Sequence, residues 1–141
     1  MIQRVQTLYL IGVIVAGILL LCVPAASLIV NGEIIKFYTS NVWSLATLSA
    51  ATILVALITI FCFKKHALQV RLSAFNMVVQ LGTAIYLWFY CSNNIASTET
   101  GADWHIGIAM AMPIVQLILS ILALRGIIKD MVILRSLDRL R

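Results

Sequence analysis

The sequence predicts an all-α membrane protein, a bundle of four transmembrane helices in one domain that covers residues 1–141. The first observation is composition: 62% of the residues are hydrophobic, 11% are charged, and the mean hydropathy is +1.06. Soluble domains are about 45–50% apolar and about 25% charged. The second observation is that the apolar residues gather in four long runs that lack Asp, Glu, Lys and Arg. A soluble protein of this size could not bury so much apolar surface, so lipid must cover it.

Each apolar run is about 19–22 residues long, which matches the ~20 residues that a helix needs to cross about 30 Å of hydrocarbon. Backbone groups in lipid must be hydrogen-bonded within their own segment, so each run is expected to be a helix. The first run is longer than the apolar core of a cleaved signal peptide, and we therefore expect it to remain as a span. The expected spans are residues 5–23, 42–63, 72–91 and 104–124.

Lysine and arginine are distributed unequally between the two ends of the expected spans. The N-terminus, the loop between the second and third spans and the tail hold nine of them, and the other two loops hold only Lys36. Because cytoplasmic loops carry the excess of basic residues, we expect both termini to be cytoplasmic. Trp43, Trp88 and Trp104 all fall at the opposite ends of their spans, as expected of an aromatic belt at the outer interface.

The loop between the first two spans, residues 24–41, contains two β-leaning runs on either side of Asn31-Gly32. Asn-Gly favours a two-residue turn because both central residues of that turn need a positive φ. We therefore predict a small hairpin at the outer surface, resting on the helix ends because an isolated hairpin is marginal in water. The second outer loop, residues 92–103, is polar, and we expect it to be irregular.

The tail, residues 125–141, alternates basic and aliphatic residues at helical spacing, which predicts a cytoplasmic C-terminal helix. This helix either continues the fourth span or lies on the lipid headgroups, with Gly126 as a position for a bend. Pro113 lies within the fourth span, and we expect it to kink that helix because it removes one backbone donor.

Polar, uncharged residues form a stripe along the third span. Spacings of four, three, four and three place the members of this stripe on one helix face, at Gln69, Ser73, Asn76, Gln80 and Thr83. Gln116 lies near the middle of the fourth span, where a hydrogen bond to Gln80 would join the two helices. The candidate contacts within the membrane are therefore Asn76, Gln80, Thr83 and Gln116. They act either in packing, between these helices or against a partner helix, or as a hydrated path or polar ligand site.

The sequence contains no constellation that predicts catalysis, a cofactor or a metal site, so we expect no enzyme. The expected spans hold no Asp, Glu, Lys or Arg, which argues against proton- or cation-coupled antiport. His66 and His105 fall on opposite sides of the membrane and cannot share a metal. Thiol-redox chemistry would require Cys22 and Cys91, both near outer span ends, to come within disulfide reach. The basic residues lie at span ends, where they orient the protein rather than bind nucleic acid.

The two ends of the chain resemble those of a known family. The opening Met1–Thr7, the closing Leu134–Arg141 and the Gln69-x-Arg71-Leu72 entry to the third span are similar to a Bacteroidota family of small four-span inner-membrane proteins. That family is catalogued as a domain of unknown function, and the resemblance covers the whole chain. It implies a bacterial cytoplasmic (inner) membrane and a four-helix fold, and it brings no activity, substrate or catalytic residue.

Charged residues near both ends of the chain would share the cytoplasmic face. This candidate surface for a partner or for lipid headgroups consists of Arg4, Arg71, Arg135, Asp138, Arg139 and Arg141. Asp138 could pair with Arg4 or Arg71 and dock the tail, while positive-inside anchoring accounts for the arginines without a partner.

The sequence thus favours a non-enzymatic accessory or scaffold subunit. Its expected partners are the lipid bilayer and either another membrane protein or a second copy of this chain, with no nucleic acid. The alternative is a small transporter or lipid-handling protein that uses the polar stripe of the third and fourth spans.

Overall fold

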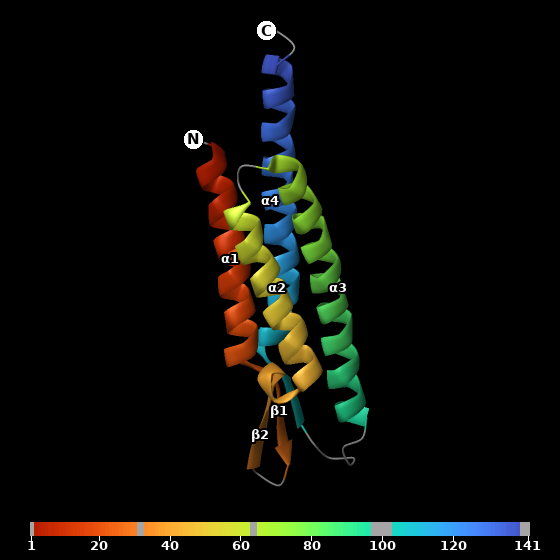
Figure 1. Cartoon of the computed structure of the whole chain (residues 1–141). Helices are drawn as coiled ribbons and strands as arrows, with labels where there is room; N and C mark the ends of the chain where they lie inside the picture. The colour runs from red at the N-terminus through yellow and green to blue at the C-terminus, as the bar shows by residue number, and fades with distance from the viewer. Residues whose placement is uncertain (1, 31–32, 63–64, 97–102, 139–141) are drawn as a thin grey trace.

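The computed structural model describes residues 2–30, 33–62, 65–96 and 103–138, which form long helices and a small sheet (Figure 1). The elements are α1 Ile2–Cys22, β1 Pro24–Val30, β2 Glu33–Tyr38, η1 Thr39–Asn41, α2 Trp43–Phe61, α3 His66–Ala96, β3 Asp103–Ile106, η2 Ile108–Ala111 and α4 Met112–Asp138. Here η marks a short 3-10 helix. Four of the helices are long and apolar enough to cross a membrane. The predicted fold class is therefore confirmed, and the chain is a multi-pass membrane protein.

Successive long helices run in opposite directions along the bundle (Figure 1). Helix α1 packs against α2 and α4, and α3 packs against the same two helices, so the four form a closed ring. One end of the bundle carries both chain termini and is called the terminal end. The other end carries the strands and is called the sheet end.

The strands form a three-stranded sheet in the order β2-β1-β3. Strand β1 pairs antiparallel with β2, with Leu28 opposite Ile35, and antiparallel with β3, with Leu28 opposite Trp104. The turn between β1 and β2, at residues 31–32, lies outside the described residues.

Helix α4 begins at Met112, whereas the sequence analysis expected the fourth span to be helical from Trp104. Residues 103–106 instead form β3, because the far edge of β1 offers them backbone hydrogen-bonding partners. Pro113 is consequently the second residue of α4, where a missing N–H costs nothing. Pro113 lies where η2 passes directly into α4, and the expected kink of that helix stays a prediction.

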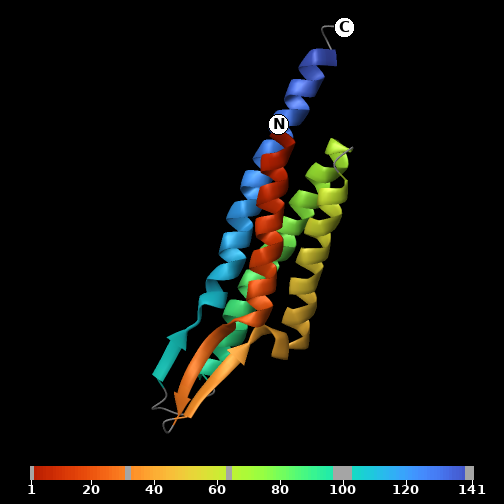
Figure 2. The same cartoon turned by 90° about the vertical axis from the view of Figure 1, so that its left-hand side faces the viewer.

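The same helix continues beyond the expected end of the fourth span. It runs through Gly126 without interruption and reaches Asp138. Figure 2 shows α4 projecting past the other three helices at the terminal end. Of the two arrangements considered for the tail, the structure therefore has the continuation of the fourth helix.

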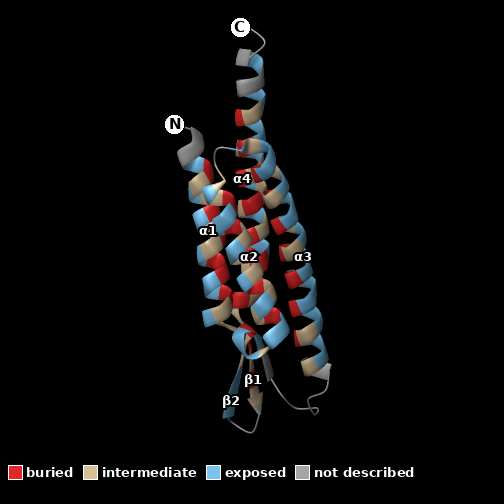
Figure 3. Cartoon of the chain, in the orientation of Figure 1, coloured by how far each residue is buried: buried red, intermediate tan, exposed pale blue. Residues whose placement is uncertain are grey.

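Burial divides each helix into an inner and an outer face (Figure 3). Large apolar side chains on the outer faces remain exposed, for example Leu8, Val78 and Phe89 at 60–69%, as lipid contact requires. At the sheet end the interior is an apolar cluster of Leu20, Ala25, Ala26, Leu45, Leu87, Cys91 and Ala109. This cluster joins the helix ends to β1 and η2.

Gly107 allows the chain to pass close to β1 between β3 and η2. Its N–H donates to the Ala25 carbonyl oxygen at 2.9 Å, and a Cβ there would meet the Pro24 carbonyl oxygen and lie 2.9 Å from the Ala25 carbonyl carbon. We expect Gly107→Ala to lower the free energy of unfolding by about 1–3 kcal/mol, because neighbouring backbone must shift. Thermal unfolding in mild detergent measures this change.

Gly82→Ala is the matched control for this prediction. Gly82 is exposed on α3, and a Cβ there meets no atom within 4 Å. Replacing a helical glycine with alanine is expected to stabilise by about 0.5–1 kcal/mol. Equal effects of the two substitutions would contradict the close approach at Gly107.

Candidate functional site

Polar side chains line the inside of the bundle between its two ends. All of them are at most 8% exposed, and they come from all four helices: Gln6, Ser49, Thr52, Thr59, Gln69, Ser73, Asn76, Gln80, Thr83, Gln116, Ser120 and Asp130. Five successive inward-facing residues of α3 are polar, and they are the stripe found in the sequence. The stripe is buried between α2 and α4, so a partner helix at the outer surface of the bundle does not reach it.

Buried hydrogen bonds connect the middle of the bundle to α4. The Ser120 hydroxyl donates to Gln80 Oε1 at 3.0 Å, and Gln116 Nε2 donates to the Val13 carbonyl oxygen at 3.2 Å. The two glutamines expected to pair with each other thus take different partners. Gly17 makes the second bond possible, because a Cβ there would lie 2.9 Å from Gln116 Nε2. Ser120 was not among the candidate contacts predicted from the sequence, although it lies one turn from Gln116 on the same face.

The buried threonines use their hydroxyls within their own helices. Thr83 donates to the Val79 carbonyl oxygen at 2.8 Å, and Thr59 donates to the Val55 carbonyl oxygen at 2.7 Å. Such bonds satisfy the hydroxyl locally. Of the candidate residues, Thr83 is therefore part of the polar face without linking two helices.

Four buried polar atoms on α2 and α3 have no hydrogen-bond partner, and the residues that carry them are called here the α2–α3 seam. The atoms are Ser49 Oγ on α2 and Ser73 Oγ, Asn76 Oδ1 and Gln80 Nε2 on α3. Leaving a buried donor or acceptor unpaired costs about 1–3 kcal/mol. The four residues are uncharged, and no group of three His, Cys, Asp or Glu able to hold a metal occurs among the described residues. Chemically the seam offers uncharged hydrogen-bond donors and acceptors.

A buried carboxylate lies near the terminal end of the interior. Asp130 of α4 is 8% exposed, and its Oδ2 accepts a hydrogen bond from Gln6 Nε2 of α1. Gly126 gives the Gln6 side chain room to reach it, since a Cβ at Gly126 would lie 2.9 Å from Gln6 Cγ. Asp130 falls within the membrane-crossing length Ile108–Ile133. The expected fourth span, residues 104–124, contains no acidic residue, and Asp130 lies six residues beyond its end on the same helix.

The spacing of residues in the sequence indicates that Asp130 faces inward. Inward residues of α4 recur at spacings of three and four, and continuing that pattern from Ile127 leads to Asp130. Exposed Arg125 and Lys129 were taken to end the fourth span. Both residues lie on the outer face of α4, and the helix continues past them to Asp138.

The candidate cytoplasmic surface can be placed only in part. Arg71 is exposed near the start of α3. Arg4, Arg135 and Asp138 are helical residues whose side chains lie outside the described part of the structure, and Arg139 and Arg141 lie outside it entirely. The expected pairing of Asp138 with an arginine therefore stays a prediction.

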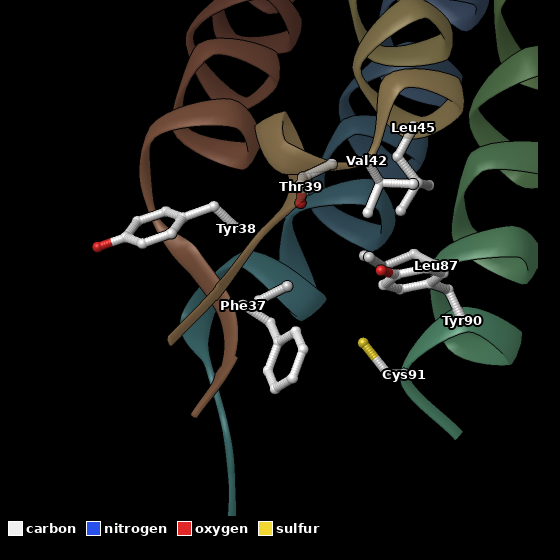
Figure 4. A pocket seen from close by; sticks show the side chains of 9 residues that line it. Phe37, Tyr38, Thr39, Val42, Leu45, Leu87, Tyr90 and Cys91 are labelled. Atoms are coloured by element: carbon white, nitrogen blue, oxygen red, sulfur yellow. The ribbon is translucent and has the colours of Figure 1, made fainter. Parts of the chain in front are cut away.

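A small pocket at the sheet end lies between β2, η1, α2 and α3 (Figure 4). Its volume is about 10 Å³ and its walls include Phe37, Leu87 and Tyr90, so it has room for about one water molecule. Cys91 lines it, and all three cysteines of the chain are free. The pocket is too small for an organic ligand.

Comparison with known proteins was made for the whole chain. The family model described as a domain of unknown function (DUF4293) matches residues 2–140. No curated protein and no solved structure matches. The match and the four apolar helices together describe an integral membrane protein of unknown function, and a more specific proposal has to come from the geometry.

The Gln6–Asp130 pair can be tested by removing its donor. Gln6→Leu leaves the buried carboxylate without this hydrogen bond, and we expect the free energy of unfolding to fall by about 1–3 kcal/mol. Asp130→Asn keeps an oxygen that accepts from Gln6, and we expect a smaller loss. Unfolding in mild detergent measures both variants. A Gln6→Leu protein as stable as the parent would contradict a structural role for the pair.

Proposed function

The chain belongs to the DUF4293 family, and we propose that it is a non-enzymatic accessory or scaffold subunit that binds another membrane protein. The observation that supports this proposal is the end of α4 after its last described buried residue, residues 131–138, called here the α4 extension. Asp130 is the last buried residue of α4 among those described, and Val132 and Ile133 beyond it are 61% and 40% exposed. Eight further helical residues correspond to about 12 Å of helix.

A helical extension of this kind needs something to stabilise it. Short helices in water are marginal without tertiary packing, and the α4 extension passes the ends of the other three helices (Figure 2). Its exposed aliphatic residues favour a partner with an apolar groove, and the exposed Arg125 and Lys129 below it favour a partner with acidic rims. Because the polar stripe is turned inward, the terminal end is the better of the two surfaces considered for a partner.

The proposed setting is a bacterial cytoplasmic membrane with the terminal end in the cytoplasm. Nine of the ten lysines and arginines belong to segments of that end, which agrees with the excess of positive charge in cytoplasmic loops. At the sheet end, Trp43 and Trp88 are 84% and 60% exposed, as aromatic residues at a membrane interface are.

Cysteine labelling in intact cells tests this orientation. In a variant whose three natural cysteines are replaced by alanine, Ile34→Cys on β2 is expected to react with a membrane-impermeant maleimide. Ser136→Cys on the α4 extension is expected to react only after the membrane is permeabilised. Both positions are exposed, so failure to react cannot be attributed to burial. Labelling of position 136 alone in intact cells would reverse the proposed orientation.

Site-specific photo-crosslinking in native membranes tests the partner. A photoreactive residue at Val132 is expected to form an adduct with another protein. Ile118 is the matched control, because it is 54% exposed and lies fourteen positions earlier on nearly the same face of α4. Protein adducts in equal yield from both positions, or from neither, would contradict the proposal. An adduct of two copies of this chain would indicate a homo-oligomer and not an accessory subunit.

A small transporter or lipid-handling protein is the second candidate. It is favoured by the unpartnered atoms at the α2–α3 seam, with Asn76 2% and Gln80 0% exposed. A carrier that used this seam would have to open the apolar cluster at the sheet end, where Leu20 and Leu45 are fully buried. The second candidate therefore requires a second conformation, which the accessory subunit does not.

A further inference from the structure

We propose that the polar interior of the bundle is a water-binding site, closed at the sheet end and supplied from the terminal end. The water molecules bridge the unpartnered atoms of Ser49, Ser73, Asn76 and Gln80. This inference depends on the chain alone and not on the proposed partner, so each can fail without the other.

Two of the four residues with unpartnered atoms, Ser49 of α2 and Gln80 of α3, lie at similar heights on their antiparallel helices. Ser44 of α2 and Tyr86 of α3 are joined by a hydrogen bond of 2.9 Å, which fixes the level of these antiparallel helices. Ser49 lies five residues from Ser44 toward the terminal end, and Gln80 lies six residues from Tyr86 in the same direction. At 1.5 Å per residue these distances are about 7.5 and about 9 Å, so the two side chains are less than one helical turn apart in height.

The chemistry of the four atoms fits water better than an ion. Asn76 Oδ1 lacks a donor and Gln80 Nε2 lacks an acceptor, although the two residues are one turn apart on the same buried face. One water molecule can donate to the first and accept from the second. Ser49 lies at the height of Gln80 and Ser73 lies about one turn from Asn76 on the other side, so each serine hydroxyl can bond to a further water molecule. A divalent cation would need several oxygen ligands, usually with carboxylates among them.

The two ends of the interior differ in polarity. Toward the terminal end, Gln6, Gln69 and Asp130 are polar and 4–8% exposed, with the apolar Leu10 and Ile127 between them and the seam at 0–2%. Toward the sheet end, Leu20, Leu45 and Leu87 form part of an apolar cluster and are 0–2% exposed. The polar residues of the terminal end therefore favour exchange of the bound water with that end.

Magnetisation transfer from water, measured by solid-state NMR on the full chain in lipid bilayers, tests the site directly. We expect rapid transfer to the side chains of Asn76 and Gln80 and slow transfer to the methyl groups of Leu45 and Leu87. Transfer to Asn76 and Gln80 no faster than to these leucines would overturn the proposal. Vesicles that contain the protein are expected to take up water no faster than protein-free vesicles, and faster uptake would overturn the closure at the sheet end.

Two substitutions test whether the transfer to Gln80 comes from a bound water molecule or only from closeness to the surface. Asn76→Leu is similar in size and removes one partner of the shared water, and it is expected to slow transfer to Gln80 several-fold. Thr83→Val is the matched control, because its hydroxyl lies on the same face but already donates to the Val79 carbonyl oxygen. Transfer to Gln80 should be unchanged in that control. If Asn76→Leu does not fold, Ser49→Ala at the height of Gln80 gives the same comparison, and unchanged transfer to Gln80 in the variant used would contradict the shared water.

Discussion

The absence of hydrogen-bonding partners in lipid is the constraint on which the rest of the structure depends. A polar side chain on the outside of a membrane bundle has nothing to bond to, so the polar face of each helix must turn inward. On α3 this places Asn76 and Gln80 inside while Phe75 and Val78 are exposed. The arrangement is the reverse of a soluble bundle, and it fixes the rotation of each helix about its axis.

Within that arrangement, the two sides of the bundle satisfy their polar groups differently. Helices α1 and α4 are joined at two levels, by Gln116 to the Val13 carbonyl oxygen and by Gln6 to Asp130. In each case a glycine, Gly17 or Gly126, provides the space for a long amide side chain. The α2–α3 seam has unpartnered atoms instead. One side is thus a closed, directly bonded interface, and the other depends on something added between its helices.

Much of this fold could be predicted from the sequence because lipid makes local patterns decisive. Four apolar runs predict four helices, and the spacing from Gln69 to Thr83 predicts one shared face. Features that depend on distant contacts could not be predicted in this way. Strand β3 exists because β1 is beside it, and Ser120 rather than Gln116 meets Gln80 because packing sets the register of α3 and α4. Asp130 was missed because charges on the outer face of α4 were taken as the end of the span.

The sheet has a consequence for the order in which the protein assembles. Strand β1 lies between a neighbour that follows it at once, β2, and one that is made only after α2 and α3, β3. Pairing with β3 fastens the α1–α2 connection to the segment that leads into α4. The first three helices must therefore be synthesised before this closure can form, so the last strand to join makes the ring a single unit late in biogenesis.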